Sequence, residues 1–277
     1  MRTRFLSKLT NGEVEQYLER NDIIFVPVGV TETHGALPLD AETVLAEAVA
    51  LTMAEAVDGL VLHNLPYFFA GGTTVGRGTV QMSIADGKAY LQKIANSLLK
   101  QGFRRQVYVT SHGPAYLTVS SMVRDFFDET KVPLLYMDML KTAEAVNIDL
   151  LSSFHDLVIG AYDKLGRLED VPLNIPESSS VTYDVQHMLD GMAKNPANKL
   201  GKYAYQSGAV GSYFDAPSDH MTTPKLTTAE QRAEYAARGV MAINDLVKAL
   251  DMPAIVENLR EADQYTNQTS VQRYSHC

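Results

Sequence analysis

An apolar run that leads straight into a cluster of polar side chains is the feature that most constrains this chain. Residues 23–28 have the length and composition of a buried strand, and Gly29 marks a turn directly after them. The side chains that could bind a ligand there are Glu32, His34, Asp40 and Glu42. In an open α/β sheet, ligands bind at the carboxyl ends of the strands. The stretch is therefore either a ligand site rich in donor atoms or a polar loop whose carboxylates only stabilise the N-terminus of the next helix.

Short apolar runs alternate with helical patterns through the first half of the chain. Strands are expected at 23–28, 60–65, 106–110 and 134–137, and helices at 12–20, 41–56, 84–101 and 116–129. This alternation predicts a mainly parallel sheet with right-handed crossovers, flanked by helices. The glycine-rich stretch 68–79 is expected to be a long functional loop. We expect one α/β domain that spans residues 1–277.

The second half of the chain is less regular. Helices are expected at 148–165, 183–194 and 227–250, with loops at 171–180 and 206–224. The last ten or so residues are expected to be frayed.

Composition and charge exclude several classes of protein. The 277 residues are 45% apolar and 21% charged, which is enough apolar material for a sizeable core. A formal net charge of −9 argues against nucleic-acid binding. The one cysteine, Cys277, cannot form an intramolecular disulfide, and no apolar run reaches membrane-spanning length. With an N-terminus that lacks a signal-peptide core, these features predict a cytoplasmic globular protein with a small-molecule substrate and no membrane partner.

A second polar turn follows the third expected strand. His112 lies there in the sequence S-H-G-P. Because the carboxyl ends of parallel strands share one edge of a sheet, His112 can converge with the donors after the first strand. Imidazole and carboxylate ligands suit zinc, manganese or iron(II). We expect one or two divalent metals per chain, and two would need a bridging carboxylate, could hold a hydroxide and could polarise a carbonyl.

The motifs around these donors resemble those of the creatininase (creatinine amidohydrolase) family. The stretch P-V-G-V-T-E-T-H-G-A-L-P-L-D-A-E-T is similar to that family's signature, and S-H-G is similar to its N-G-H-G-G-N. Gly78–Thr79 lies where the family has a glycine–threonine pair. The later G-A-V-G at 208–211 and T-A-E-Q-R-A-E-Y-A-A-R-G resemble the family's late motifs. The resemblance implies a creatininase-like fold, a metal-dependent hydrolase activity and a homo-oligomer, with a hexamer as the expected form.

The resemblance also implies the roles of individual residues. Glu32 and His34 match the first two metal ligands, and His112 matches the histidine after the third strand. The family's bridging aspartate precedes a threonine, as Glu42 precedes Thr43 here, so Glu42 is assigned as the bridge. Asp40 is the reserve.

The chain departs from the family pattern in places that concern the substrate. Pro114 stands where some members have a metal-binding glutamate, and the motif H-A-G-x-x-E-T-S has no clean copy. Glu177 and His155 are the candidates to replace its catalytic acid. His220, beside Asp219 in the late aromatic loop, is a further candidate to line the pocket of its own or an adjoining subunit.

Three functions fit the sequence. The first is a metal-dependent hydrolase in which activated water attacks the carbonyl of a cyclic or linear amide. The second is a creatininase-like hydrolase of a carbocyclic ketone of the inosose type, or of a peptide bond. The third is a non-catalytic scaffold that keeps the fold. A relative of creatininase is favoured over creatininase itself because the chain has no tryptophan to stack on a small planar ring.

Overall fold

A four-stranded parallel sheet forms the centre of the protein. The computed structural model describes residues 1–200, 203, 208 and 214–269. The strands are β1 (Ile23–Pro27), β2 (Leu60–Val61), β3 (Arg105–Thr110) and β4 (Leu135–Asp138). Their order across the sheet is β2-β1-β3-β4, and all three pairings are parallel. The expected α/β fold with a parallel sheet flanked by helices is therefore confirmed.

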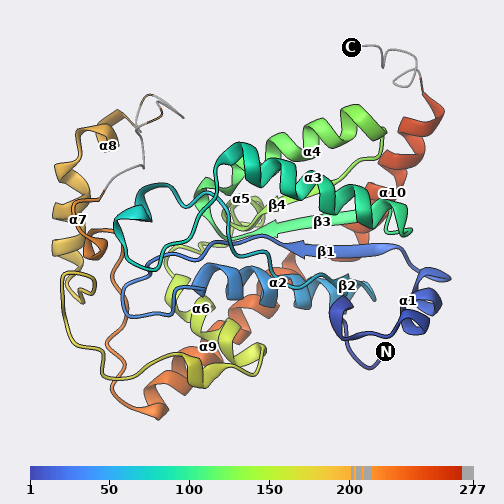
Figure 1. Ribbon diagram of the computed structural model, residues 1–277. Helices are drawn as coiled ribbons and strands as arrows, with labels where there is room; N and C mark the ends of the chain where they lie inside the picture. Colours follow the sequence, from blue (N-terminus) through green and yellow to red (C-terminus); the bar gives the residue numbers. More distant parts are fainter. Residues whose placement is uncertain (201–202, 204–207, 209–213, 270–277) are drawn as a thin grey trace.

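Helices cover both faces of this sheet (Figure 1). The helices of the first half are α1 (Asn11–Leu18), α2 (Ala41–Ala56), α3 (Ile84–Lys100), α4 (Tyr116–Thr130) and α5 (Met139–Ala145). Those of the second half are α6 (Phe154–Lys164), α7 (Val185–Lys194), α8 (Pro196–Leu200), α9 (Ala229–Ala249) and α10 (Met252–Gln268). In Figure 1, α3 and α4 lie on one face and α2, α6 and α9 on the other, while α7 and α8 stand beyond the carboxyl ends of the strands.

Strand β1 separates two hydrophobic cores because successive side chains of a strand point to opposite faces. Ile23 and Phe25 pack with α2, α6, α9 and α10. Ile24 and Val26 pack with α3 and α4 on the other face. All five residues of β1 are buried, as expected of a central parallel strand with helices on both sides. Because β1 is held between two cores, the position at which the following polar residues leave the sheet is fixed.

The second half differs from expectation in four places. Residues 148–153 form turns, and the helix expected from 148 begins only at Phe154. Three helices were not expected: α5 directly after β4, the short α8 after α7, and α10 near the end of the chain. Helix α10 is capped by Asp251, whose side chain accepts from the Ala254 amide, and it packs Val256 and Leu259 into the core.

Two further expectations concern the ends and surfaces of the chain. Among the described residues, no helix is both long enough and apolar enough to cross a membrane. The frayed end expected for the last ten residues falls almost entirely outside the described residues, as does most of the G-A-V-G motif.

Candidate metal centre

The loop after β1 buries its first two candidate ligands. Glu32 is 1% exposed and His34 is fully buried. The loop is compact because the Glu32 amide donates to the Leu39 carbonyl at 2.9 Å and the Leu37 amide donates to the His34 carbonyl at 3.1 Å. Gly29 lets helix α2 start close by, since a Cβ there would lie 2.6 Å from the Cα of Thr43. The turn therefore places the start of α2 against the end of β1.

The start of helix α2 places the two candidate acidic residues, Asp40 and Glu42, in different surroundings. Glu42 lies in the first turn and is 9% exposed, and Asp40 occupies the N-cap two residues earlier. Residues two apart on a helix do not face each other. Asp40 turns toward α6, where it accepts a hydrogen bond from the Tyr162 hydroxyl and pairs with Arg167 at 2.9 Å. The structure thus brings Glu42, and not Asp40, to the loop after β1.

His112 arrives from the neighbouring strand β3, as the shared edge of a parallel sheet requires. Its Nδ1 atom lies 2.6 Å from Oε2 of Glu42 and 3.2 Å from Oε1 of Glu32. On the other side of Glu42, Oε1 lies 3.7 Å from Nε2 of His34. The two oxygens of one carboxylate therefore face two different histidines. That is the arrangement a bridging ligand needs.

His34 carries the observation that tests whether a metal fits here. Its Nδ1 lies 3.2 Å from the Glu32 carbonyl, which can only accept, so Nδ1 carries a proton, and in the neutral ring Nε2 presents a lone pair. This Nε2 atom is buried and has no hydrogen-bond partner. A buried unsatisfied polar atom costs about 1–3 kcal/mol. Ligand atoms of Glu32, His34 and Glu42 all lie within 4.8 Å of one another, so the donor set suits a divalent cation.

The cluster is held together electrostatically when no metal is present. Burial by itself lowers the pKa of His112, but the Glu42 and Glu32 carboxylates outweigh it and hold that pKa well above its usual value. Burial opposes ionisation of Glu42, yet His112 and then His34 keep its pKa well below the usual range. The pKa of His34 is raised in the same way, with Glu42 again outweighing burial. A bound cation would replace the imidazolium charge as partner of the carboxylates.

Neighbouring groups hold three of the four central residues in place. The Thr73 hydroxyl, from the 3-10 turn η2 (Gly71–Val75) of the glycine-rich loop, donates to Oε2 of Glu32. The His112 Nε2–H donates to the Phe69 carbonyl at 2.9 Å. The Ser111 hydroxyl donates to the Glu42 carbonyl at 2.8 Å. Such outer contacts orient metal ligands, and the sequence identified none of these three residues because their spacing carries no metal-site signal.

The late segment around residue 220 closes over the loop after β1. The Thr223 hydroxyl accepts from the Ala36 amide at 3.2 Å. His220 lies against His34, with ring centroids 5.5 Å apart. His155, on α6, donates from Nε2 to the Thr222 carbonyl at 2.6 Å. His155, a candidate for the catalytic acid, therefore contacts the segment that carries His220, a candidate to line the pocket.

The pKa values of these two histidines are lowered. For His155, burial outweighs the Thr222 carbonyl and the Asp156 carboxylate. For His220, burial and the positive charge of His34 act together. Both imidazoles are therefore neutral near neutral pH and can accept a proton or a cation.

Glu177 is not brought to this cluster. It is exposed in the loop before α7, and its charge acts on Tyr183, whose pKa is raised first by burial and then by Glu177. Among the described residues, no hydrogen bond or ion pair joins Glu177 to the four central side chains. A catalytic role for Glu177 stays a prediction.

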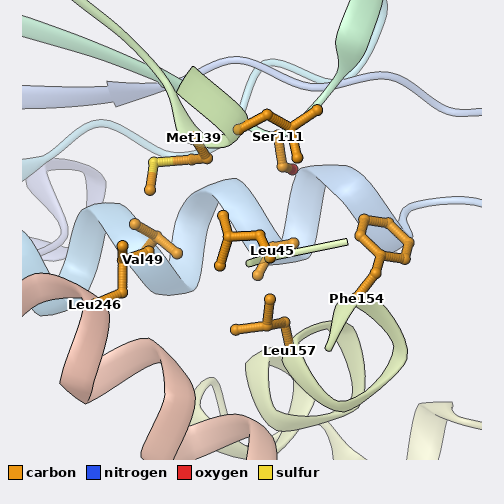
Figure 2. Close-up of a pocket in the computed structure, with 9 residues that line it drawn as sticks. Leu45, Val49, Ser111, Met139, Phe154, Leu157 and Leu246 are labelled. Carbon is orange, nitrogen blue, oxygen red and sulfur yellow. The ribbon is translucent and has the colours of Figure 1, made fainter. Parts of the chain in front are cut away.

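An apolar cavity lies next to the cluster, between α2, α6 and α9 (Figure 2). Leu45 and Val49 of α2 face Phe154 and Leu157 of α6 across it. Its volume is about 10 Å³, which holds no more than one water molecule. It is therefore a packing defect and not the substrate pocket.

Comparison with known proteins identifies a family that matches this chain. A family profile, Creatininase (creatinine amidohydrolase), matches residues 7–158. A curated relative, the 3-dehydro-scyllo-inosose hydrolase of Thermotoga maritima, is 24% identical over 137 residues. That match covers 49% of this chain and 44% of the relative, so the chain aligns with less than half of the relative's length.

Solved structures show the same fold over nearly the whole chain. A Bacteroides fragilis protein assigned as a creatinine amidohydrolase superposes with a TM-score of 0.62 and 19% identity, covering 96% of this chain and 98% of the other. A creatinine amidohydrolase (creatininase) gives 0.59 and 16%, covering 94% and 99%. A creatininase in a manganese form gives a TM-score of 0.58 with 18% identity, covering 94% of this chain and 98% of the other. A creatininase variant in a zinc–zinc form gives a TM-score of 0.57 with 18% identity, covering 90% of this chain and 98% of the other. At these identities, similarity to the solved structures shows the fold alone.

Proposed function

The chain belongs to the creatininase family, and from the centre that it carries we propose that it is a metal-dependent hydrolase. The observation that supports this most is the buried Nε2 of His34, which lacks a partner and faces the Glu42 carboxylate at 3.7 Å. Glu32, His34, Glu42 and His112 would hold one or two divalent cations, and nitrogen with carboxylate oxygen suits zinc, manganese or iron(II). A cation held there would polarise a carbonyl group and make a water molecule more acidic.

The protein's own contribution is to fix its donors in advance. Each central histidine gives one ring N–H to a backbone carbonyl, His34 to Glu32 and His112 to Phe69, which sets the tautomer and leaves the other nitrogen toward the carboxylates. Thr73 holds one oxygen of Glu32, so the other is directed at His112. Little reorganisation is needed when a ligand binds.

We assign proton transfer to His155. Its Nε2–H is used by the Thr222 carbonyl, which leaves the Nδ1 lone pair free to accept a proton. In the reaction, water adds to the carbonyl carbon, the carbon–nitrogen bond breaks, and the nitrogen leaves with a proton. A neutral imidazole next to the centre can take the proton from water and return it to the leaving nitrogen. The exposed position of Glu177 makes it the weaker candidate.

A cyclic or linear amide is the first substrate class that we propose, in keeping with the family. The likeness to an inosose hydrolase favours a second class, a polyhydroxylated cyclic ketone, in which a carbon–carbon bond breaks instead. Creatinine itself is disfavoured because the chain has no tryptophan.

A substrate panel tests the proposal. The protein is stripped with a chelator, reloaded with zinc or manganese, and offered cyclic amides and cyclic polyhydroxy ketones, with products measured by mass spectrometry. We expect hydrolysis in one class that disappears on stripping and returns on reloading. Metal-loaded protein that turns over neither class, or activity that survives complete stripping, would favour the scaffold alternative.

Two variants separate the candidate proton carriers. His155→Gln keeps a donor for the Thr222 carbonyl but lacks Nδ1, so we expect kcat to fall about 10²–10⁴-fold. Glu177→Gln is the matched control on the exposed loop, and its kcat should stay close to that of the wild type. The reverse pattern would transfer the role to Glu177.

We also propose that the protein assembles as a homo-oligomer, with a hexamer as the expected form. Helix α7 supports this because Val185, Leu189 and Met192, spaced four and three apart, are exposed on one helix face. A monomer mass in light scattering at micromolar concentration would contradict it.

A further inference from the structure

The two sides of the centre are unequally supplied with ligands. On one side there are three donors: His112 Nδ1, with Glu42 Oε2 2.6 Å and Glu32 Oε1 3.2 Å from it. On the other side, His34 Nε2 has Glu42 Oε1 at 3.7 Å and the same Glu32 oxygen at 3.9 Å. Glu32 is thus shared, and the His34 side has only two donors to itself. Catalytic metal sites usually have three protein ligands, so this side lacks one.

His220 stands beside that side and is held in the same way as His34. Its Nδ1 lies 3.0 Å from the Thr33 carbonyl, as the Nδ1 of His34 lies 3.2 Å from the Glu32 carbonyl. Both carbonyls can only accept, so both rings carry a proton on Nδ1, and each ring in its neutral form presents a lone pair on Nε2. A ligating histidine almost always gives its other N–H to such a carbonyl or carboxylate. Two successive carbonyls of one loop therefore orient two histidines alike.

The spacing of the two rings suits a shared cation. Two imidazoles bound through nitrogen at about 2.1 Å to one tetrahedral zinc have ring centres roughly 5 Å apart. The centroids of His34 and His220 are 5.5 Å apart, with an interplanar angle of 67°. To share one ion, the Nε2 atom of His220 would have to point to the same position as the Nε2 atom of His34.

We propose that His220 is the third ligand of the metal on the His34 side, supplied by the segment after the 3-10 turn η5 (Pro217–Asp219). This inference rests on the proposed function, since it needs a metal centre at these residues. Ligation by His220 would join residues 32–42 to a segment far away in the sequence. The late segment thereby becomes part of the centre instead of only covering it.

A pair of substitutions tests the proposal by metal binding. His220→Asn puts an amide nitrogen close to the position of Nδ1, so it can keep the bond to Thr33, but it lacks Nε2. His187→Ala is the matched control, because His187 contacts the same segment at Ser218 Oγ (3.1 Å) and Asp219 Oδ1 (3.5 Å) from outside the centre. Bound zinc per chain is measured by elemental analysis after gel filtration, and affinity by competition with a chromophoric chelator. Melting of the metal-free proteins reports whether each variant folds.

We expect His220→Asn to weaken at least one zinc by about ten-fold or more, in line with the sensitivity of metal centres to their supporting groups. His187→Ala should bind zinc as the wild type does. The inference is overturned if His220→Asn binds every zinc as tightly as the wild type, or if His187→Ala weakens binding equally. In either case wild-type zinc binding leaves the proposed function standing, whereas a wild type that binds no zinc removes both.

Discussion

Substitution of Gly239 by alanine tests how the helices behind the centre are packed. Gly239 lies on α9 and packs against Asp156 of α6, the residue that follows His155 in the sequence. A Cβ atom at Gly239 would lie 1.7 Å from the Asp156 carbonyl oxygen and 2.9 Å from the Cα of Gly160. The contact with the carbonyl is about 1.3 Å closer than the 3.0 Å that real Cβ atoms respect. The obstacle is backbone, so the two helices themselves must separate.

The expected loss of stability follows from two opposing effects. Alanine gains roughly 1 kcal/mol over glycine in a helix interior. Overpacking costs typically 1–3 kcal/mol and more when backbone must move, and this clash belongs at the upper end. We expect a net destabilisation of about 2 kcal/mol, which lowers the melting temperature by roughly 4–8 °C for a chain of this size.

Thermal unfolding followed by circular dichroism measures the effect. Gly12→Ala is the matched control, because Gly12 lies in helix α1 with nothing within 4 Å of an added Cβ, and we expect it to be stabilising. A Gly239→Ala protein that melts at or above the wild-type temperature would refute the close packing of α6 on α9.

Three further predictions concern the core and the centre. Leu157→Ala enlarges the apolar cavity of Figure 2 and should cost about 2–5 kcal/mol in denaturant unfolding, whereas an unchanged midpoint would contradict the packing shown there. Thr73→Val removes the hydroxyl that holds Glu32 and should weaken zinc binding about 10-fold in chelator competition, and wild-type affinity would count against this positioning. In the metal-free protein the raised pKa of His112 stabilises the fold below about pH 6.5, and this stabilisation is lost as the pH rises through the raised pKa. Because zinc must displace that proton, its affinity should rise with pH until the pH passes the raised pKa of His112, and calorimetry in buffers of different ionisation enthalpy should detect proton release.

The fold of the first half could be predicted because local patterns and packing agree there. Helix α2 spans Ala41–Ala56 as expected, and β1 differs from the expected strand by one residue. Strand β2 is shorter than the expected 60–65 because only Leu60 and Val61 pair continuously with β1, while Leu65 returns as an isolated bridge to Val28. Hydrophobic runs identify buried segments more reliably than they fix the number of residues that pair.

Helix α10 was missed although its start signals are present in the sequence. Asp251 is a favourable N-cap, and Pro253 lies in the first turn, where proline is tolerated. The helix buries Met252, Val256, Leu259 and Thr266, which are separated by polar residues, and no helix was expected in this segment. Only the packing of this face on the core distinguishes a helix here from an unstructured segment.

The candidate site was predictable where it follows strand ends. Glu32 and His112 converge because β1 and β3 are adjacent and parallel. Glu42 was preferred to Asp40 only through the family resemblance, because local spacing does not show that Tyr162 and Arg167, which lie far along the chain, hold Asp40 away from the centre. The placement of a side chain that depends on a distant partner is not encoded in local spacing.

His220 shows the same limit more strongly. Its place beside His34 depends on the path of the chain between α7 and α9, which no periodic pattern specifies. The available signal was a histidine in a loop rich in aromatic residues, and that signal indicates a pocket without saying which atoms meet.

The metal content of three proteins tests the central claim most directly. Wild type, Glu42→Gln and Asp40→Asn are purified alike, loaded with zinc, passed through gel filtration and analysed for metal per chain. Because the two Glu42 oxygens face His34 and His112, Glu42→Gln should lose most of its metal, while Asp40→Asn should keep it, since Asp40 pairs with Arg167 instead. Loss of metal from Asp40→Asn with retention in Glu42→Gln would contradict the assignment of the bridge. A wild type that binds no zinc would contradict the metal centre itself.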